Sequence, residues 1–415
     1  MFEKLRKGFA QFGPGLLYAG AAVGVSHLVQ STRAGADFGF SLIWVVVIMN
    51  IIKYPIFEIG PRYAAATGQT LLDGYLKIGR WAVLLYAIMS IATMFIIMAA
   101  ITLVTSGLLH QLTGFGADIK LLGLILLASS SVILVVGRYS MLDRFMKMII
   151  ITLAFCTMIA LLFAVIEPME TQPEFLQSFS FSDRSHILFL VALIGWMPAP
   201  VDIVIWHSVW SVSKNKERGS RMSLSMALRD FKVGYWGTTF LAVAFLSLGA
   251  FMMYGTGNKP STSAVGFAEQ LVQLYTYHIG QWAFPFIALA AFTTMFSTLL
   301  TCLDAFPRTL RKSTKLLIPM LDDKRKHQQL YRFWIVFTVV GTAVVLFYFG
   351  HDMGDMVDFA TTISFVLAPI LAFLNYKAMN HASIESAFKQ PAWLSKFGLV
   401  SITILALISI LFLIY

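Results

Sequence analysis

Long apolar stretches are the feature that most restricts how this chain can fold. A helix that crosses the hydrocarbon core of a bilayer needs about 20 predominantly apolar residues. Eleven stretches meet that requirement, at 14–33, 39–65, 80–110, 119–137, 144–166, 186–211, 233–255, 280–304, 331–350, 356–376 and 394–414. Only 13% of the 415 residues are charged, against about 25% in a soluble protein. The sequence therefore predicts an all-α polytopic membrane protein with about eleven transmembrane helices in a single domain over residues 1–415.

Basic residues occupy alternate loops, and this pattern predicts the orientation of the chain. One set of loops contains Lys and Arg clusters within 4–7, 62–80, 138–147, 214–229, 308–326 and 377–396. The other set is mostly acidic, with Glu167, Glu170, Asp352 and Asp355 among its members. Loops rich in Lys and Arg stay in the cytoplasm. We therefore expect a protein of the cytoplasmic (inner or plasma) membrane with its N-terminus inside and its C-terminus outside.

The same rule accounts for the formal net charge of +10, so we expect no nucleic-acid partner. The expected partners are the lipid bilayer and a small ion or solute, and we expect a monomer. The two cysteines, Cys156 and Cys302, both fall in apolar spans. Because the sequence contains no catalytic triad, phosphate-binding loop or metal-cysteine motif, we expect neither an enzyme nor a bound cofactor, apart from a transported divalent metal ion.

The sixth span contains the segment GWMPAPVDIVIWHSVW, which predicts an interrupted helix. Pro198 and Pro200 lack the amide hydrogen that a helix needs, and the residue before each proline is pushed toward extended geometry. Broken backbone at membrane depth is tolerated only where it is buried in protein or lines a cavity. Asp202 follows the break directly, and His207 lies five residues further on. This arrangement is typical of a transport site on a discontinuous helix.

The first span has a matching weak point. Gly20 and Gly24 loosen its helix, Ser26 is expected to cap a new half-helix, and His27 follows. Because spans 1 and 6 are five spans apart, the two breaks predict an inverted repeat. We expect repeat one over about 14–167, repeat two over about 186–377, and an extra helix over about 394–414.

Four segments resemble the Nramp-type family of divalent metal ion transporters. These are Ala34–Trp44 (AGADFGFSLIW) after span 1, Gly137–Lys147 at the start of span 5, His207-Ser208 after the span 6 motif, and Ser364–Lys377 (SFVLAPILAFLNYK) in span 10. The resemblance covers most of the chain. It implies a LeuT-type fold, with a 5+5 inverted repeat whose helices 1 and 6 are discontinuous, plus helix 11.

The chain departs from the family at the residues that bind metal. The family carries Asp-Pro-Gly-Asn in span 1, where this sequence has Gly24-Val25-Ser26-His27, so the carboxylate is absent and His27 replaces the amide. The family carries Met-Pro-His-Asn in span 6. Here that motif aligns either with Met197-Pro198-Ala199-Pro200 or, if His207-Ser208 is the anchor, with Pro200-Val201-Asp202-Ile203. Both registers remain open, and we expect a diverged relative.

The candidate site residues gather at the two breaks. The predicted substrate site contains Gly24, Ser26, His27, Met197, Pro200 and Asp202. Within it His27 and Asp202 are the candidate metal ligands, because imidazole suits transition metals and an intramembrane carboxylate is by default a functional hypothesis. For His27 the competing interpretation is a polar residue satisfied by its neighbours. For Asp202 it is an acid that complements the positive end of a helix.

Three further residues are candidates for a proton or coupling path. The family match suggests this role for His207, which otherwise is a histidine of the core or the interface. Lys53 and Glu58 in span 2 are five residues apart, so they do not share a helix face. We expect each to pair elsewhere or to extend its charged end toward the cytoplasm.

The leading hypothesis is a secondary transporter that works by alternating access. Its expected substrate is a divalent metal ion such as Mn, Mg or Fe, with protons as the candidate coupling ion. The first alternative is transport of an anion or small organic solute after loss of the metal site, since two half-helix N-termini favour negative charge. The second alternative is a membrane sensor or partner protein that transports nothing.

Overall fold

The computed structural model describes residues 13–414 except 115, 137–138, 322–323 and 351, without the side chains of 139–150, 278, 324 and 325. Almost all of this part of the chain is helical, and it contains no strand. The principal helices are α2 (Pro14–Ala22), α3 (Thr32–Phe38), α4 (Ile43–Phe57), α5 (Ile59–Thr67), α6 (Leu71–Ile78), α7 (Arg80–Thr113), α8 (Ile119–Val136), α9 (Tyr139–Ile166), α10 (Arg184–Trp196), α11 (Asp202–Arg218), α12 (Leu224–Met252), α13 (Ala264–Ile279), α14 (Phe284–Leu317), α15 (Lys324–Phe349), α16 (Met353–Met379) and α17 (Ala392–Ile414).

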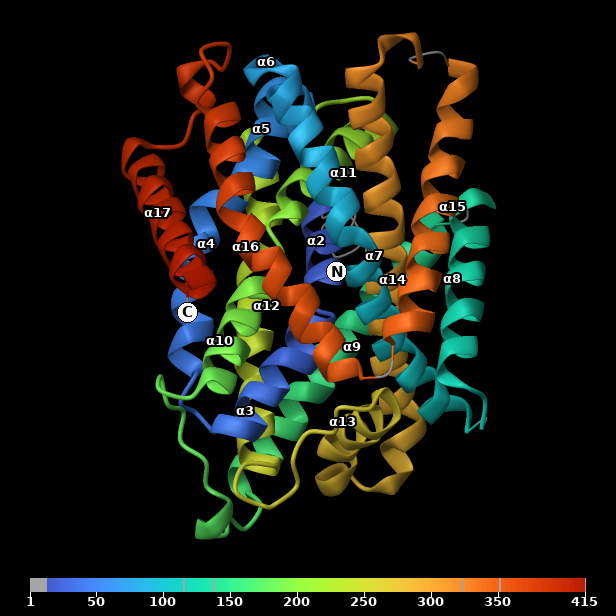
Figure 1. Cartoon of the computed structure of the whole chain (residues 1–415), viewed down its shortest axis with the longest axis vertical. Coiled ribbons are helices and arrows are strands. Elements are labelled where there is room, and N and C mark those ends of the chain that lie inside the picture. Colours follow the sequence, from blue (N-terminus) through green and yellow to red (C-terminus); the bar gives the residue numbers. More distant parts are fainter. Residues whose placement is uncertain (1–12, 115, 137–138, 322–323, 351, 415) are drawn as a thin grey trace, which may run out of the picture.

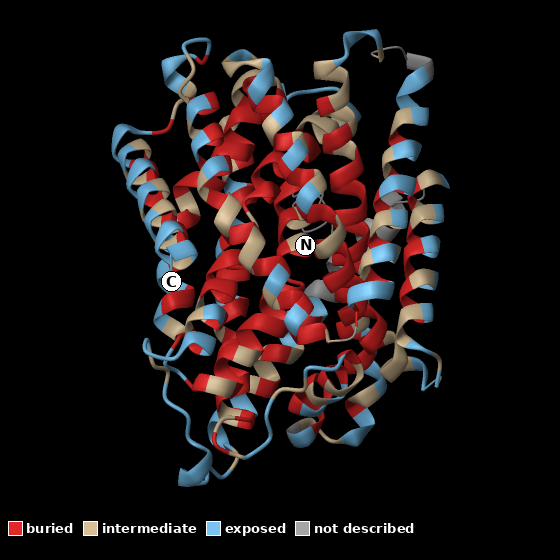
Figure 2. Ribbon diagram, in the orientation of Figure 1, coloured by how far each residue is buried: buried red, intermediate tan, exposed pale blue. Residues whose placement is uncertain are grey.

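A π-helix, η1 (Val25–Ser31), joins α2 to α3, and short 3-10 turns lie at Pro173–Phe175, Gln281–Ala283, Pro319–Leu321 and Ser386–Phe388. The segments α2, α7, α11 and α12 form the centre of the bundle, with α17 at one edge and α8 and α15 at the other (Figure 1). The central helices are buried, whereas those at the edges expose much of their surface (Figure 2).

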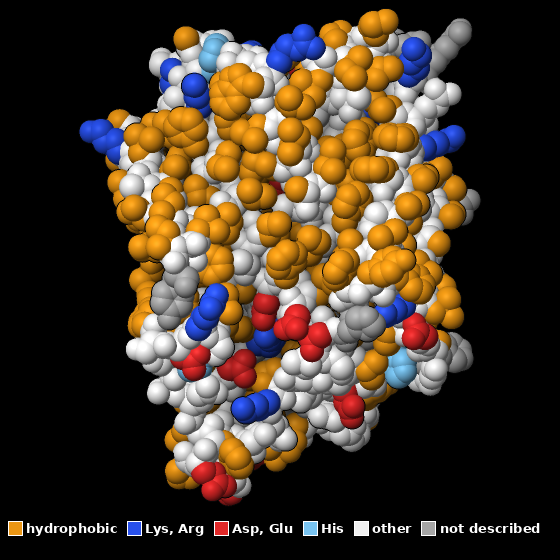
Figure 3. Space-filling view, viewed as in Figure 1, with side chains coloured by type: hydrophobic (Ala, Val, Ile, Leu, Met, Phe, Trp, Pro, Cys, Tyr) orange, Lys and Arg blue, Asp and Glu red, His pale blue; other side chains and the backbone are white. Residues whose placement is uncertain are grey.

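The outer surface is strongly apolar. Large side chains such as Trp44, Ile88, Val132, Phe155 and Leu411 are exposed, and hydrophobic side chains form a broad band around the visible face (Figure 3). A soluble monomer rarely exposes so much contiguous apolar surface, whereas the lipid-facing surface of a membrane protein requires it. The chain is therefore an integral membrane protein.

Eight helical segments in the described part of the chain are long and apolar enough to cross a bilayer. Three of the eleven predicted spans fall outside this set. The spans at 14–33 and 186–211 are broken into shorter helices, and 144–166 falls within α9, whose first side chains are not described. The count of eleven stays a prediction.

Acidic side chains are unevenly distributed along the long axis of the molecule. On the visible face, the end that carries α5 and α6 shows Lys and Arg side chains, whereas the Asp and Glu side chains lie toward the end that carries α3 and α13, together with further Lys and Arg (Figures 1 and 3). This distribution is in line with the alternation of basic and acidic loops in the sequence. The basic residues of the predicted N-terminal tail and the family-like Gly137 and Arg138 lie outside the described residues.

Both halves of the first broken helix pack closely against α12. A methyl group added at Gly15 would overlap the carbonyl oxygen of Asp230, and one added at Gly35 would overlap that of Leu246. Small residues that let backbones approach are the usual device for packing membrane helices. As a result, α12 forms a common support for the segments on both sides of the first break.

Candidate transport site

The first break lies at Val23 and Gly24. Helix α2 ends at Ala22, and η1 begins at Val25 after two residues with non-helical backbone. A Cβ atom at Gly24 would lie 2.7 Å from side-chain atoms of Thr298 on α14, so a glycine is required there by close packing.

Ser26 has a different role from the predicted one. Its hydroxyl donates to the carbonyl oxygen of Ala22 at 2.6 Å, and Gly24 is the N-cap of η1 without a side-chain cap. The expectation that Ser26 caps the second half-helix was therefore wrong. The serine instead satisfies a carbonyl at the end of the first half, because the i→i−4 direction is the one open to a hydroxyl within a helix.

The second break separates α10 from α11. Helix α10 ends at Trp196, and α11 begins at Asp202, with Pro198 and Pro200 in the irregular segment between them. The break predicted from the two prolines is confirmed. Helices 1 and 6 are both discontinuous, as the fold class required.

A small cavity lies where the two breaks meet α7 and α14. Its volume is about 20 Å³, and its lining includes Val25, Ser26, Trp196, Pro200, Thr298 and Cys302. A cavity of this size holds about one water-sized particle.

Ser26 and Pro200 of the predicted site line this cavity, and Gly24 packs against Thr298 in its wall. Met197 is fully buried within the second break. The sequence reasoning did not identify Thr298 or Cys302 as site residues. Both come from α14. The one feature of the sequence that could have identified them is that they are polar and lie four residues apart, on one face of an apolar helix.

His27 and Asp202 are held by different neighbours. The two ring nitrogens of His27 face the Ser26 hydroxyl at 2.8 Å and the Thr238 carbonyl oxygen at 2.9 Å. Asp202 is buried in the first turn of α11, where an acid complements the positive end of the helix. Among the described residues, no three His, Cys, Asp or Glu side chains form a metal-binding group.

Lys53 and Glu58 also have separate partners, as their spacing predicted. The Lys53 ammonium donates to the carbonyl oxygens of Ile194 at 2.6 Å and Gly195 at 3.2 Å, and the side chain is fully buried. It thus caps the carbonyl end of α10 at the second break, where a positive charge complements the helix dipole. Glu58 instead accepts from Arg62 at 2.7 Å and from the Tyr54 hydroxyl at 2.8 Å.

His207 lies on α11 beyond the break, buried against the rings of Tyr18 and Phe231. Its Nδ1 atom is 3.3 Å from the Ser211 hydroxyl. The structure therefore places His207 next to the first half of helix 1, and it is not among the residues that line the cavity between the two breaks.

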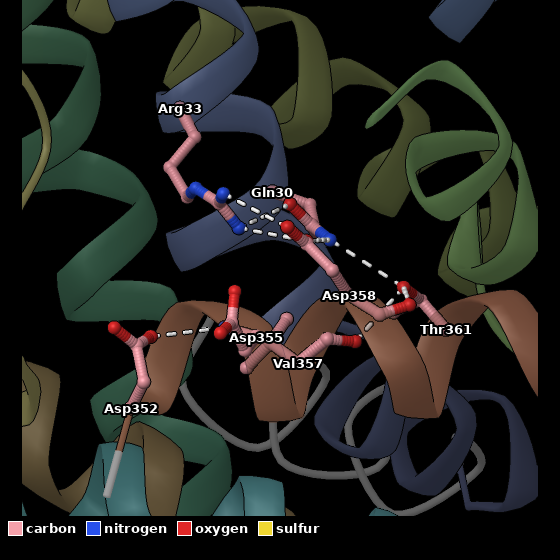
Figure 4. Close-up of polar contacts among 7 residues, drawn as sticks. All are labelled: Gln30, Arg33, Asp352, Asp355, Val357, Asp358 and Thr361. Atoms are coloured by element: carbon pink, nitrogen blue, oxygen red, sulfur yellow. Dashed lines mark hydrogen bonds and ion pairs between the residues drawn. The ribbon is translucent and has the colours of Figure 1, made fainter. Parts of the chain in front are cut away.

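Each half of helix 1 is held by a carboxylate on a neighbouring helix, a feature absent from the sequence predictions. At the acidic end, Arg33 donates to both Asp358 oxygens at 2.8 and 3.0 Å, and the Gln30 amide donates to one of them at 2.8 Å (Figure 4). Nearer the basic end, Asp230 accepts from the backbone amides of Gly13 at 3.2 Å and Gly15 at 2.7 Å. These contacts join η1 and α3 to α16, and the start of α2 to α12.

Comparison with known proteins places this geometry in a family. A family model described as "Nramp: Natural resistance-associated macrophage protein-like" matches residues 15–415. Uncharacterized protein PM0681 of Pasteurella multocida is 34% identical over 404 residues, which cover 97% of this chain and 92% of that protein. The divalent metal cation transporter MntH of Levilactobacillus brevis is 23% identical over 426 residues, covering 95% of this chain and 87% of that protein.

Solved structures share the fold. The manganese transporter of Eremococcus coleocola, crystallised in a mutant form, aligns with a TM-score of 0.69 at 15% identity over 96% of this chain and 85% of its own. MhsT in complex with L-phenylalanine aligns with a TM-score of 0.63 at 13% identity over 97% of each chain. The LeuT-type architecture with interrupted helices 1 and 6 is confirmed, and with the match over residues 15–415 the chain belongs to the Nramp family.

Proposed function

We propose that this protein is a secondary transporter that moves a divalent metal ion through the cavity between the two breaks by alternating access. The observation that carries the proposal is the cavity itself, at the junction of two interrupted helices. Midplane sites between discontinuous helices bind the substrate in transporters of this kind. Family membership and the names of two similar proteins, a divalent metal cation transporter and a manganese transporter, support the choice of substrate.

The lining of the cavity narrows the class of metal. Ser26 and Thr298 supply hydroxyl oxygens, and Cys302 supplies a thiol. Manganese prefers oxygen ligands such as these hydroxyls, whereas a sulfur ligand suits iron better. Magnesium usually keeps several waters when bound. Because the cavity has room for about one water-sized particle, a manganese- or iron-like ion fits it better than hydrated magnesium.

The remaining features of the proposal concern topology and coupling. The basic end of the molecule is cytoplasmic, with the N-terminus inside and the C-terminus outside the cytoplasmic membrane. Residues 14–167 and 186–377 form the two repeats, with 394–414 as an added helix. The monomer is the proposed working unit. Lys53, Glu58 and His207 are the candidates for a coupling path, and His27 and Asp202 support the site from its two breaks.

A second candidate substrate, an anion or small organic solute, is favoured by one specific observation. The buried Lys53 ammonium lies at the carbonyl end of α10. The adjacent Trp196 lines the cavity, and its indole N–H has no hydrogen-bond partner in the described part of the chain. The charge of the Lys53 ammonium and the unpaired N–H donor of Trp196 both favour a substrate that accepts hydrogen bonds. The structural neighbour MhsT holds L-phenylalanine in the same fold.

Uptake into liposomes separates these candidates, and the two cysteines provide a matched pair of variants. Cys302→Ala removes the thiol that lines the cavity, whereas Cys156→Ala changes the other cysteine, on α9. We expect Mn²⁺ uptake by the wild-type protein, reduced uptake by Cys302→Ala, and unchanged uptake by Cys156→Ala. Calorimetry that detects no divalent-ion binding at millimolar concentration, together with uptake of an anion or organic solute, would establish the second candidate. Absence of flux for all solutes would favour a sensor.

A further inference from the structure

An apolar groove lies between α4, α10 and α17, which neighbour one another at one edge of the molecule (Figure 1). Its volume is about 520 Å³, and all of its lining side chains are hydrophobic. On α10 the groove is lined by Ile187, Leu190, Val191 and Ile194, a spacing that places them on one helix face. None of the residues that line the groove also lines the cavity between the two breaks.

Trp44 and Phe181 lie at the mouth of the groove. Both line it, and both side chains are exposed. Trp44 is in the first turn of α4, and Phe181 precedes the start of α10, so they mark the end of the groove nearer the acidic end of the molecule. Tryptophan is enriched where the hydrocarbon core of a membrane meets water. The mouth is therefore expected at the membrane surface.

The length of the groove matches one leaflet of a bilayer. Its lining runs from Trp44 to Ile52 on α4 and from Ile187 to Ile194 on α10, or about 10–12 Å along each helix. Half of the hydrocarbon core of a bilayer is about 15 Å thick. An acyl chain that enters at the mouth would therefore remain in its own leaflet and end near the midplane of the bilayer.

The inner end of the groove adjoins the second break. Ile194 lines the groove, and its carbonyl oxygen accepts from the buried Lys53 ammonium at 2.6 Å. Ile52, the residue before Lys53, lines the groove as well. An acyl chain in the groove would thus contact α4 and α10 beside the hydrogen bond that joins them.

A cationic side chain without a partner lies near the mouth. Arg184 precedes Ile187 by three residues on α10, so the two share a helix face. The Arg184 side chain is exposed and has no hydrogen bond or ion pair in the described part of the chain. The neighbouring Asp183 accepts from the amide and the hydroxyl of Ser185. A guanidinium suits the bidentate recognition of a phosphate, whereas Asp183 opposes a head group with further negative charge.

We propose that the groove between α4, α10 and α17 binds one phospholipid of the leaflet at the acidic end, with an acyl chain in the groove and the phosphate on Arg184. The proposal concerns the lipid and does not depend on which solute the protein transports. This lipid differs from those over the rest of the apolar surface, because the groove encloses its chain and Arg184 holds its head group. Since the chain packs on Ile194, the bound lipid stabilises the carbonyl end of α10 at the second break.

Native mass spectrometry of the purified full chain, titrated with phosphatidylethanolamine, tests the proposal. Two isoleucines of α4 provide matched variants, because Ile48 and Ile51 are 43% and 44% exposed, and Ile48 lines the groove whereas Ile51 is not among its lining residues. Ile48→Trp places a large ring in the groove. We therefore expect loss of the tightly held phospholipid in Ile48→Trp and wild-type affinity in Ile51→Trp.

The head-group contact has a test of its own. Arg184→Gln should weaken phosphatidylethanolamine binding by about tenfold, the order expected when one charge-assisted hydrogen bond is lost. Lys259→Gln, which removes an exposed positive charge from another loop, should leave the affinity unchanged. Diacylglycerol has the same chains without the phosphate, so it should bind the wild type and Arg184→Gln equally.

The outcomes that would overturn the proposal are distinct. Equal phosphatidylethanolamine affinities in the wild type and Ile48→Trp would exclude the groove as the site. An affinity that Arg184→Gln leaves unchanged would exclude the phosphate contact. A dimer that retains no phospholipid and dissociates in Ile48→Trp would show that a second copy of the chain covers the groove.

A second pair of variants keeps the test valid if Ile48→Trp fails to fold. Leu411 and Leu413 on α17 are 65% and 66% exposed, and Leu411 lines the groove whereas Leu413 is not among its lining residues. Leu411→Trp should therefore lose the phospholipid and Leu413→Trp should retain it, and equal affinities would again contradict the site. Because lipid binding is read without a metal ion, these results are independent of whether the proposed function holds.

Discussion

The contact between Arg33 and Asp358 is expected to control how easily the acidic end of the molecule opens. The pair joins α3 to α16, and the side chains of Arg33 and Asp358 are 14% and 32% exposed. It thus lies between a surface ion pair, worth about 0–1 kcal/mol, and a buried pair, whose rupture costs about 3–5 kcal/mol. Asp358→Asn keeps an acceptor oxygen and removes the charge, so we expect a loss of about 1–2 kcal/mol, somewhat less than the about 1.5–3 kcal/mol of a hydrogen bond to a charged group.

Hydrogen–deuterium exchange in lipid nanodiscs measures this loss directly. A change of about 1–2 kcal/mol corresponds to a factor of about 5–30 in an equilibrium constant, so amides of η1 and α3 should exchange about 5- to 30-fold faster in Asp358→Asn. Asp355→Asn is the matched control, because Asp355 is an exposed carboxylate on the same helix, away from the Arg33 contact (Figure 4). Equal exchange in the two variants would refute the idea that this ion pair holds the acidic end closed.

Two further predictions concern the breaks. Gly24→Ala should abolish transport because its Cβ would overlap Thr298, and the double variant with Thr298→Ala should recover part of the Mn²⁺ uptake; uptake that Gly24→Ala leaves unchanged would contradict the packing argument. Lys53→Met should leave the α10 carbonyls without their donor and destabilise the protein by about 1–3 kcal/mol, which should appear as a lower thermal midpoint in detergent. Lys77→Met, at an exposed lysine of α6, is the control, and equal midpoints in the two variants would exclude a capping role.

The breaks were predictable from sequence because their causes are local. Proline lacks an amide hydrogen wherever it occurs, so Pro198 and Pro200 predict a break in the helix from the sequence alone. The role of Ser26 was predicted wrongly because a serine can serve either side of a break. Its hydroxyl bonds the Ala22 carbonyl of the preceding turn, and only the backbone geometry at Gly24 decides between the two roles.

The residues that line the site were harder to predict from the sequence than the breaks, because the site depends on contacts between distant parts of the chain. Thr298 and Cys302 complete a cavity whose other walls come from the first and sixth spans, and Arg33 meets Asp358 across 325 residues. A single sequence contains no record of such pairings. The expected joint use of His27 and Asp202 as metal ligands stays a prediction. In the structure, His27 faces Ser26 and Thr238.

The central claim is that the cavity between the two breaks is the site of a transported metal ion. Anomalous diffraction from crystals soaked in Mn²⁺ tests it most directly, because the signal locates the ion without reference to a proposed role for any residue. We predict a peak among Ser26, Pro200, Thr298 and Cys302. A map in which that cavity has no anomalous peak while the crystals contain Mn²⁺ elsewhere, or in which the cavity holds an anion or organic solute, would contradict the account.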